Sequence, residues 1–67
     1  MKNYVITVLQ YGKFIGYIKS ISYNNSTFKI TQNKRNARKF TEDEAMGEID
    51  YLTSIAYSNG FIFGYDE

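Results

Sequence analysis

The stretch FTEDEAMGEIDYLTSIA, residues 40–56, decides the fold. It begins with a capping box, because Thr41 can accept a hydrogen bond from the main-chain N–H of Glu44 while the Glu44 carboxylate accepts one from Thr41. Glu42 and Asp43 add two more acids where the positive end of a helix dipole lies. The sequence therefore predicts a helix that starts directly after Thr41.

An apolar stripe runs along this predicted helix. Ala45, Ile49, Leu52 and Ala56 recur at spacings of four, three and four, which is one face of an α-helix. We expect the helix to cover residues 42–58 and to end at Asn59-Gly60, with Gly60 in the left-handed conformation. Further expectations are that Phe40 and Ala45 form a hydrophobic staple, that Met46 and Ile55 widen the stripe, and that Gly47 allows close approach to a sheet.

The rest of the chain favours β-strands. Residues 4–10 and 14–22 are rich in β-branched and aromatic types, and Tyr11-Gly12-Lys13 joins them as a hairpin with a three-residue loop or a bulge. A turn at 23–26 leads to a third strand at 27–31, and residues 61–65 form a fourth. The fold class is α+β. We expect one domain over residues 1–67, with its elements in the order β-β-β-α-β. In it, a small, mostly antiparallel sheet of three to four strands carries one helix on one face.

Alternation in the second strand is imperfect. Strict alternation would place Ile15, Tyr17, Lys19 and Ile21 on one side and Phe14, Gly16, Ile18 and Ser20 on the other. A glycine inside a strand often marks a bulge or a close contact with neighbouring backbone. We therefore expect one of these two features at Gly16.

Charge is divided sharply along the chain. The first 41 residues hold all eight basic residues and the last 26 hold all seven acidic ones, which gives +8 and −7. One interpretation is that the two halves pack together and attract each other. The other is a bipolar surface that steers a charged partner.

Several kinds of chemistry are absent from the composition. The chain has neither cysteine nor histidine, so it can form no disulfide and none of the common catalytic dyads or triads. Asp43, Glu44 and Glu48 lie near each other on the predicted helix, but capping and solvent exposure explain them. We expect no enzymatic activity, no cofactor and no metal site.

Apolar runs in the sequence are short. None approaches the roughly 20 residues that a membrane span needs, and the first residues alternate polar and apolar types instead of forming a signal-peptide core. We expect a cytoplasmic protein with no membrane partner.

Basic and aromatic residues supply the ingredients of a binding surface. Segment 29–39 holds five positive charges, and aromatic residues lie on the predicted strands, as in single-stranded nucleic-acid binders. The pI near 7.9 falls below the value of about 9 that is typical of nucleic-acid-binding domains. Both faces of the first strand carry large apolar side chains, so a sheet with one helix leaves an apolar face for a protein partner or for a second copy of the chain.

One segment resembles a known group of proteins. Ala37-Arg38-Lys39-Phe40-Thr41-Glu42-Asp43-Glu44-Ala45, followed by Ile49 and Leu52 and preceded by a Tyr4-Val5-Ile6 strand, resembles short accessory proteins of phages and prophages of Gram-positive bacteria. The resemblance implies a β-β-β-α-β fold without catalytic residues. It also implies a role such as inhibition of a host or defence protein, as in anti-CRISPR inhibitors, by covering a functional surface.

These observations lead to two hypotheses. The first is a phage or prophage accessory protein that acts in the cytoplasm of the bacterial host by binding a host or phage protein. The alternative is a small single-stranded nucleic-acid-binding protein that uses segment 29–39 and the sheet aromatics. The candidate partner-binding residues are Tyr17, Tyr23, Lys29, Lys34, Arg35, Arg38 and Lys39.

Overall fold

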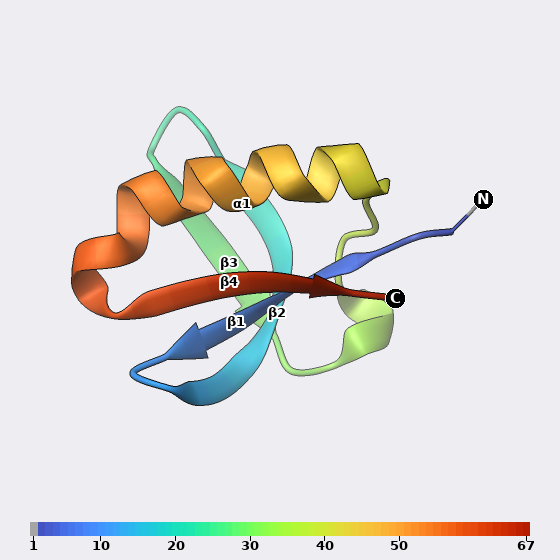
Figure 1. Cartoon of the computed structure of the whole chain (residues 1–67), viewed down its shortest axis with the longest axis horizontal. Helices are drawn as coiled ribbons and strands as arrows, with labels where there is room; N and C mark the ends of the chain where they lie inside the picture. Colours follow the sequence, from blue (N-terminus) through green and yellow to red (C-terminus); the bar gives the residue numbers. More distant parts are fainter. Residues whose placement is uncertain (1) are drawn as a thin grey trace.

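The chain folds as a four-stranded antiparallel sheet with one α-helix packed on one of its faces (Figure 1). The computed structural model describes residues 2–67. The predicted α+β class and the order of elements along the chain, β-β-β-α-β, are therefore confirmed. The elements are β1 (Val5–Gln10), β2 (Lys13–Ser22), β3 (Thr27–Thr31), the 3₁₀ turn η1 (Lys34–Asn36), α1 (Glu42–Ala56), the 3₁₀ turn η2 (Tyr57–Asn59) and β4 (Phe61–Asp66).

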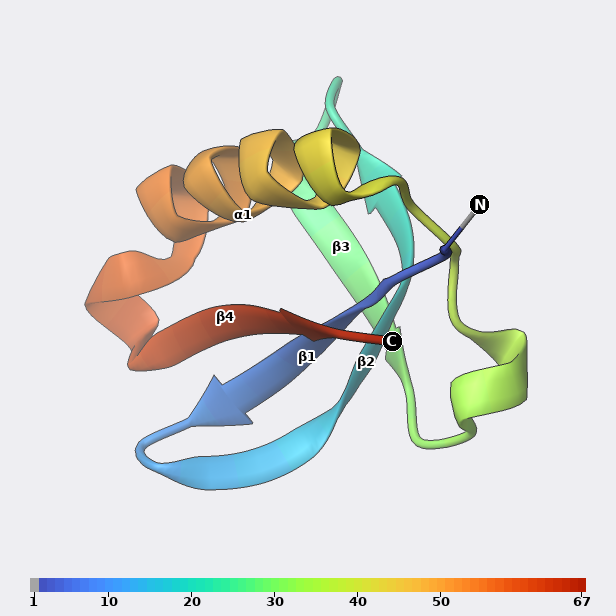
Figure 2. The same ribbon diagram turned by 45° about the vertical axis from the view of Figure 1, so that its right-hand side comes forward.

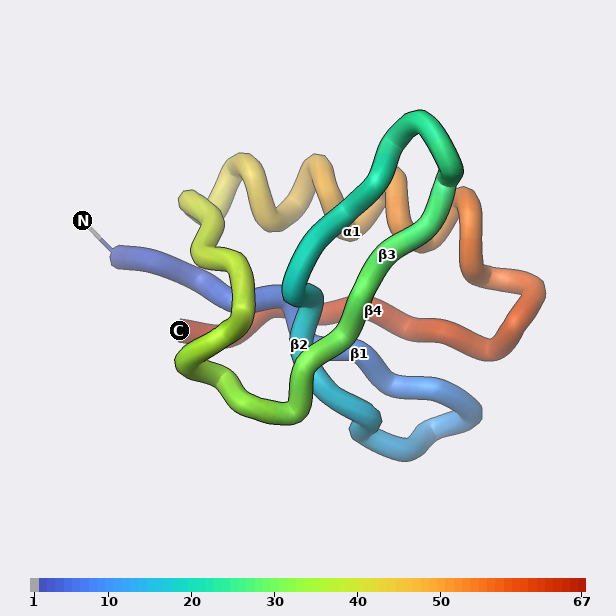
Figure 3. Tube along the Cα trace, turned by 180° about the vertical axis from the view of Figure 1, so that it is seen from behind, coloured from blue at the N-terminus to red at the C-terminus, as the bar shows by residue number. Residues whose placement is uncertain are grey.

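The sheet has the strand order β3-β2-β1-β4, and every neighbouring pair is antiparallel. After β3, the connector 32–41 and α1 carry the chain over the sheet, so that β4 can pair with β1 on the far edge. Figure 2 shows α1 lying along one face of the sheet. The two chain ends and the connector gather at the same end of the molecule (Figures 1 and 3).

The helix begins as the sequence predicts. The Thr41 hydroxyl accepts a hydrogen bond from the Glu44 N–H at 3.2 Å, and Glu44 Oε1 accepts one from the Thr41 N–H at 2.8 Å. The α-helix ends at Ala56, two residues before the predicted end, because the last turn tightens into η2. Gly60 has φ +81°, which confirms the predicted left-handed stop.

The core lies between α1 and the sheet. Leu52 and Ala45 of the helix are buried, and Phe40 packs in the same cluster, as the staple predicts. Met46 is 53% exposed and Gly47 has no atom near its Cβ position, so the expected wider stripe at Met46 and the close approach at Gly47 are wrong. The sheet contributes Ile6, Val8, Ile18 and Phe63.

The β1–β2 connection is tighter than predicted. Strand pairing continues to Gln10 and Lys13, so the turn has two residues, Tyr11 and Gly12, instead of three. Both have positive φ, +50° and +82°, as a type I′ hairpin turn requires. Lys13 therefore belongs to β2.

Two bulges set the faces of β2. Ile15 and Lys19 have no partner in the pairing registers, and each extra residue shifts the alternation by one position. As a result Ile15, Ile18 and Ile21 all pack on the helix side, and the side assignment expected from strict alternation is wrong. Phe14 and Tyr17 lie on the other face.

Gly16 lies against the backbone of β3. Its φ is +151°, and a Cβ there would lie 2.8 Å from the main-chain oxygen of Thr31. The predicted close contact is confirmed, because any side chain would collide with the neighbouring strand.

Within residues 2–67, no helix has the length and apolar character that crossing a bilayer requires.

Candidate binding surface on the open face of the sheet

The second face of the sheet has no helix over it. Along β1, Val5, Thr7 and Leu9 point away from α1, because Ile6 and Val8 between them belong to the core. On β4, Ile62 and Asp66 lie opposite Leu9 and Val5 and therefore share this face. We call it the open face.

An apolar patch occupies one end of the open face. Leu9 pairs with Phe14 on β2 and with Ile62 on β4, so three large side chains form a row across the sheet. Phe14 is 54% exposed and Ile62 58%. The Tyr17 ring lies 5.2 Å from the Phe14 ring, centroid to centroid, and extends the row. We call Leu9, Phe14, Tyr17 and Ile62 the open-face patch.

The connector between β3 and α1 shapes the other end of the open face. The Asn33 side chain caps η1 by accepting a hydrogen bond from the Arg35 N–H at 2.9 Å. Farther along, the Arg38 N–H donates to the Ile18 carbonyl oxygen at 3.0 Å, and Phe40 pairs with Tyr4 through two main-chain hydrogen bonds of 2.8 Å. The connector is thereby fixed against the sheet beside the start of β1.

A pocket of about 580 Å³ lies where the connector meets the chain ends. Val5, which is 1% exposed, is one of its lining residues. The other lining residues are Asn3, Lys34, Arg35, Lys39 and Glu67. Three of these six residues are basic, and we call this site the cationic pocket.

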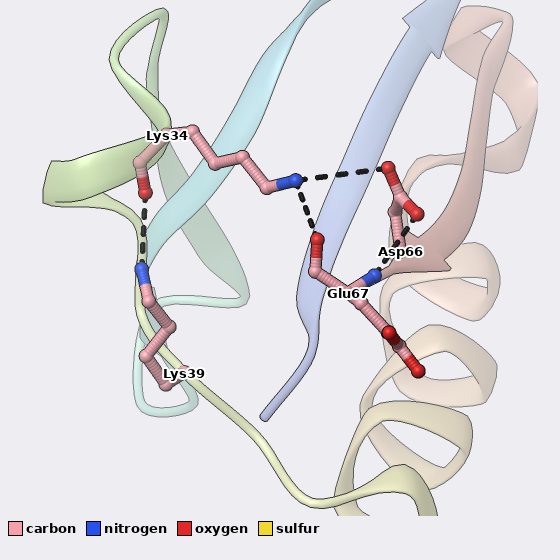
Figure 4. Close-up of polar contacts among 4 residues, drawn as sticks. All are labelled: Lys34, Lys39, Asp66 and Glu67. Carbon is pink, nitrogen blue, oxygen red and sulfur yellow. Dashed lines mark hydrogen bonds and ion pairs between the residues drawn. The ribbon is translucent and has the colours of Figure 1, made fainter. Parts of the chain in front are cut away.

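The cations of this pocket differ in their contacts (Figure 4). The Lys34 ammonium reaches across β1, donates a hydrogen bond to the main-chain oxygen of Glu67 and lies 3.8 Å from a carboxylate oxygen of Asp66. The Lys39 ammonium donates to the carbonyl oxygens of Lys34 and Ala37 at 3.0 and 3.1 Å. Within residues 2–67, no hydrogen bond or ion pair involves the Arg35 guanidinium.

Two of the predicted residues lie elsewhere, beside α1. The Arg38 guanidinium lies over the Phe40 ring at 4.9 Å from its centroid. The Tyr23 hydroxyl donates a hydrogen bond to Glu48, and this bond, with burial and the Glu48 charge, raises the pKa of Tyr23 above its ordinary value. The Tyr23 ring also packs on Tyr51 at 5.1 Å. Arg38 and Tyr23 line a small pocket of about 220 Å³ on this side.

The structure thus separates the predicted binding residues into three groups. Lys34, Arg35 and Lys39 come together in the cationic pocket. Tyr17 and Lys29 lie on the open face, on neighbouring strands. Tyr23 and Arg38 lie beside α1, so the seven candidate residues do not form one continuous surface.

Charge is arranged in layers. The helix α1 carries five acidic residues and no basic one, whereas all eight basic residues lie outside it. The division along the sequence therefore becomes an acidic helix on one side and a mainly basic sheet and connector on the other. Asp66 and Glu67 are the acids outside the helix, and both lie beside the cations of the pocket.

Sequence reasoning missed three members of the open-face patch, Leu9, Phe14 and Ile62, as binding residues. Strict alternation set Phe14 and Tyr17 on opposite sides, because the bulge at Ile15 depends on pairing with β1. That Phe14 and Tyr17 share the open face could have been predicted only if the bulge at Ile15 had been known.

A comparison of the chain with family models, with curated proteins and with solved structures finds no match. Residues 2–67 also contain no group of acidic residues placed to hold a metal ion.

Proposed function

We propose that this chain is a binding protein that docks another protein on the open face of its sheet. The observation that carries the proposal is the open-face patch, in which Phe14 and Ile62 are both more than half exposed and lie in one row with Leu9. Contiguous apolar side chains cost free energy when they face water, and such patches commonly mark interaction sites.

The form of the patch supports a protein partner. A flat face of aromatic and aliphatic side chains with polar neighbours resembles the central region of protein interfaces, where aromatic residues are enriched. Pockets found in residues 2–67 are open hollows, and none of those described is a deep, enclosed cleft that would shield a reaction from water. The chain therefore acts by occupying a surface on its partner.

The resemblance to phage and prophage accessory proteins supports a more specific role. In that role the partner is a host or defence protein in the bacterial cytoplasm, and the open face covers a functional surface of it. Inhibition then follows from steric exclusion and needs no cofactor.

Single-stranded nucleic acid is the second candidate, because Lys29 lies next to the Tyr17–Thr31 pair on the open face. The remaining geometry favours a protein. Lys34 and Lys39 already make polar contacts within the chain, and Arg38 lies beside α1. Phe28, Phe61 and Phe63 pack on the helix side and are not free to stack on bases.

Site-specific photocrosslinking tests the proposal. A benzophenone amino acid is placed at Phe14 or at Met46, which are matched in exposure at 54% and 53% but lie on the open face and on α1. The proteins are irradiated in a nuclease-treated lysate of a Gram-positive bacterium. We expect one discrete protein adduct from position 14, none from position 46, and loss of the adduct in Ile62→Ser.

Equal adducts from both positions would contradict the proposal, and so would an adduct that contains only a second copy of the chain. An adduct that appears only when nuclease is omitted would favour the nucleic-acid candidate.

A further inference from the structure

The cationic pocket already holds acidic groups of this chain. Lys34 binds the main-chain oxygen of Glu67 and lies near the Asp66 carboxylate, while Arg35 contributes a guanidinium without a polar partner in residues 2–67. From this charge complementarity we propose that the pocket accepts an acidic segment of the partner protein, which displaces Asp66 and Glu67 from Lys34. This inference depends on the proposed docking function and specifies the chemistry of the partner.

The chemistry of the pocket favours carboxylates on an extended peptide. Arg35 presents a planar fork of N–H donors that matches a carboxylate, and Lys34 adds a mobile point charge. Val5 supplies an apolar lining residue beside these cations. An extended peptide with acidic side chains suits both the cations and Val5, because its carboxylates pair with the cations and the aliphatic parts of its side chains pack on the valine.

The pocket and the open-face patch lie at opposite ends of β1 on the same face. Val5 lines the pocket and Leu9 belongs to the patch, so the two sites are four positions apart along the strand. At about 3.4 Å per residue the separation is about 14 Å. An extended partner segment that reaches both sites therefore carries its acids about four residues from an apolar anchor.

Asp66 and Glu67 act as internal competitors for the pocket in this arrangement. Asp66 and Glu67 are both exposed and their ion pairs are solvent-accessible, so they contribute little to stability and exchange readily with another carboxylate. Neutralising Asp66 removes the carboxylate that lies 3.8 Å from the Lys34 ammonium, and neutralising Glu67 removes a second negative charge at the pocket. The main-chain oxygen of Glu67 keeps its hydrogen bond from Lys34 until the partner segment displaces it.

The experiment measures fluorescence anisotropy of a labelled peptide at about 0.1 M salt, where charges more than about 10 Å apart are largely screened. The peptide has three glutamates, a three-residue Ser/Gly spacer, then phenylalanine and leucine, so that the nearest glutamate lies four positions from the phenylalanine. The pocket variant is K34Q/R35Q. The matched control is K13Q/K19Q, which removes the same charge from exposed lysines of β2 outside the pocket. Circular dichroism checks that each variant folds.

We expect K34Q/R35Q to weaken binding at least about tenfold, the factor for one charge-assisted hydrogen bond. K13Q/K19Q should change affinity by less than about threefold, since distant surface charges are partly screened. D66N/E67Q should bind the peptide more tightly than the unchanged chain. Equal weakening in the pocket and control variants would overturn the inference, as would absence of measurable binding.

Two further probes separate this inference from the proposed function. A peptide with glutamines in place of the glutamates should bind much more weakly. If it binds equally well and Phe14→Ser abolishes that binding, docking on the patch stands and the acidic partner is wrong. A single-stranded oligonucleotide of equal charge that binds more tightly than the acidic peptide, with the same dependence on Lys34 and Arg35, would also overturn the inference.

Discussion

Replacing one buried and one exposed aliphatic side chain, in separate variants, tests which face of the sheet forms the core. Leu52 is fully buried between α1 and the sheet, whereas Ile62 on β4 keeps 58% of its surface exposed. The two changes are Leu52→Ala and Ile62→Thr. Threonine keeps the β-branched shape that suits a strand, so the second change removes mainly apolar contact.

The expected losses of unfolding free energy differ severalfold. Truncating a buried leucine to alanine costs about 2–5 kcal/mol, through lost transfer free energy and the cavity left behind. Fully burying an isoleucine stabilises by about 1.5–3 kcal/mol, and Ile62 is less than half buried, so its loss should stay below about 1 kcal/mol. A domain of this length has about 3–10 kcal/mol in total, so Leu52→Ala removes much of it.

Urea unfolding followed by circular dichroism measures both values. The two variants should share one slope of free energy against urea and differ only in midpoint, because neither change alters the surface exposed on unfolding by much. If Ile62→Thr costs as much as Leu52→Ala, the open face is covered in solution and the reasoning fails. It also fails if Leu52→Ala costs less than about 1 kcal/mol.

Four further substitutions, in three tests, probe local parts of the structure. Gly16→Ala should destabilise the fold by about 1–3 kcal/mol, because alanine is strained at φ +151°. Gly47→Ala should stabilise the helix by up to about 1 kcal/mol. If thermal melts show that both substitutions shift the melting temperature in the same direction, this pair of predictions is refuted. Thr41→Ala should cost about 1 kcal/mol through the lost cap, and an unchanged melting temperature would contradict the capping box. The raised pKa of Tyr23 means that the stabilising bond to Glu48 is present below the ordinary tyrosine pKa of about 10 and is lost as pH rises through the folded-state pKa. In Tyr23→Phe, the absorbance titration at 295 nm should therefore show one fewer tyrosine that ionises above the ordinary pKa. An unchanged titration curve at high pH would argue against the bond.

The helix could be predicted because its signals are local. Thr41 and Glu44 form the cap within three residues, and the buried positions Ala45, Leu52 and Ala56 repeat with the period of the helix itself. Met46 was assigned wrongly, because its side chain is 53% exposed and the buried stripe is narrower than periodicity suggests.

The candidate binding surface could be predicted only in part. The bulges at Ile15 and Lys19 arise from the pairing of β2 with β1 and β3. The sequence of β2 alone therefore could not predict that Phe14 and Tyr17 lie on one face. The cations of segment 29–39 form no single patch, because Arg38 and Lys39 are neighbours in a fixed connector yet line different pockets.

Methyl NMR with a soluble paramagnetic probe measures the openness of the second face most directly. Ile6 and Ile62 are the same residue type on adjacent strands, with 0% and 58% of their surface exposed. The account predicts strong relaxation of the Ile62 methyl signals and none at Ile6 or Leu52, in a sample that sediments as a monomer. Equal protection of Ile62 and Ile6 would contradict it.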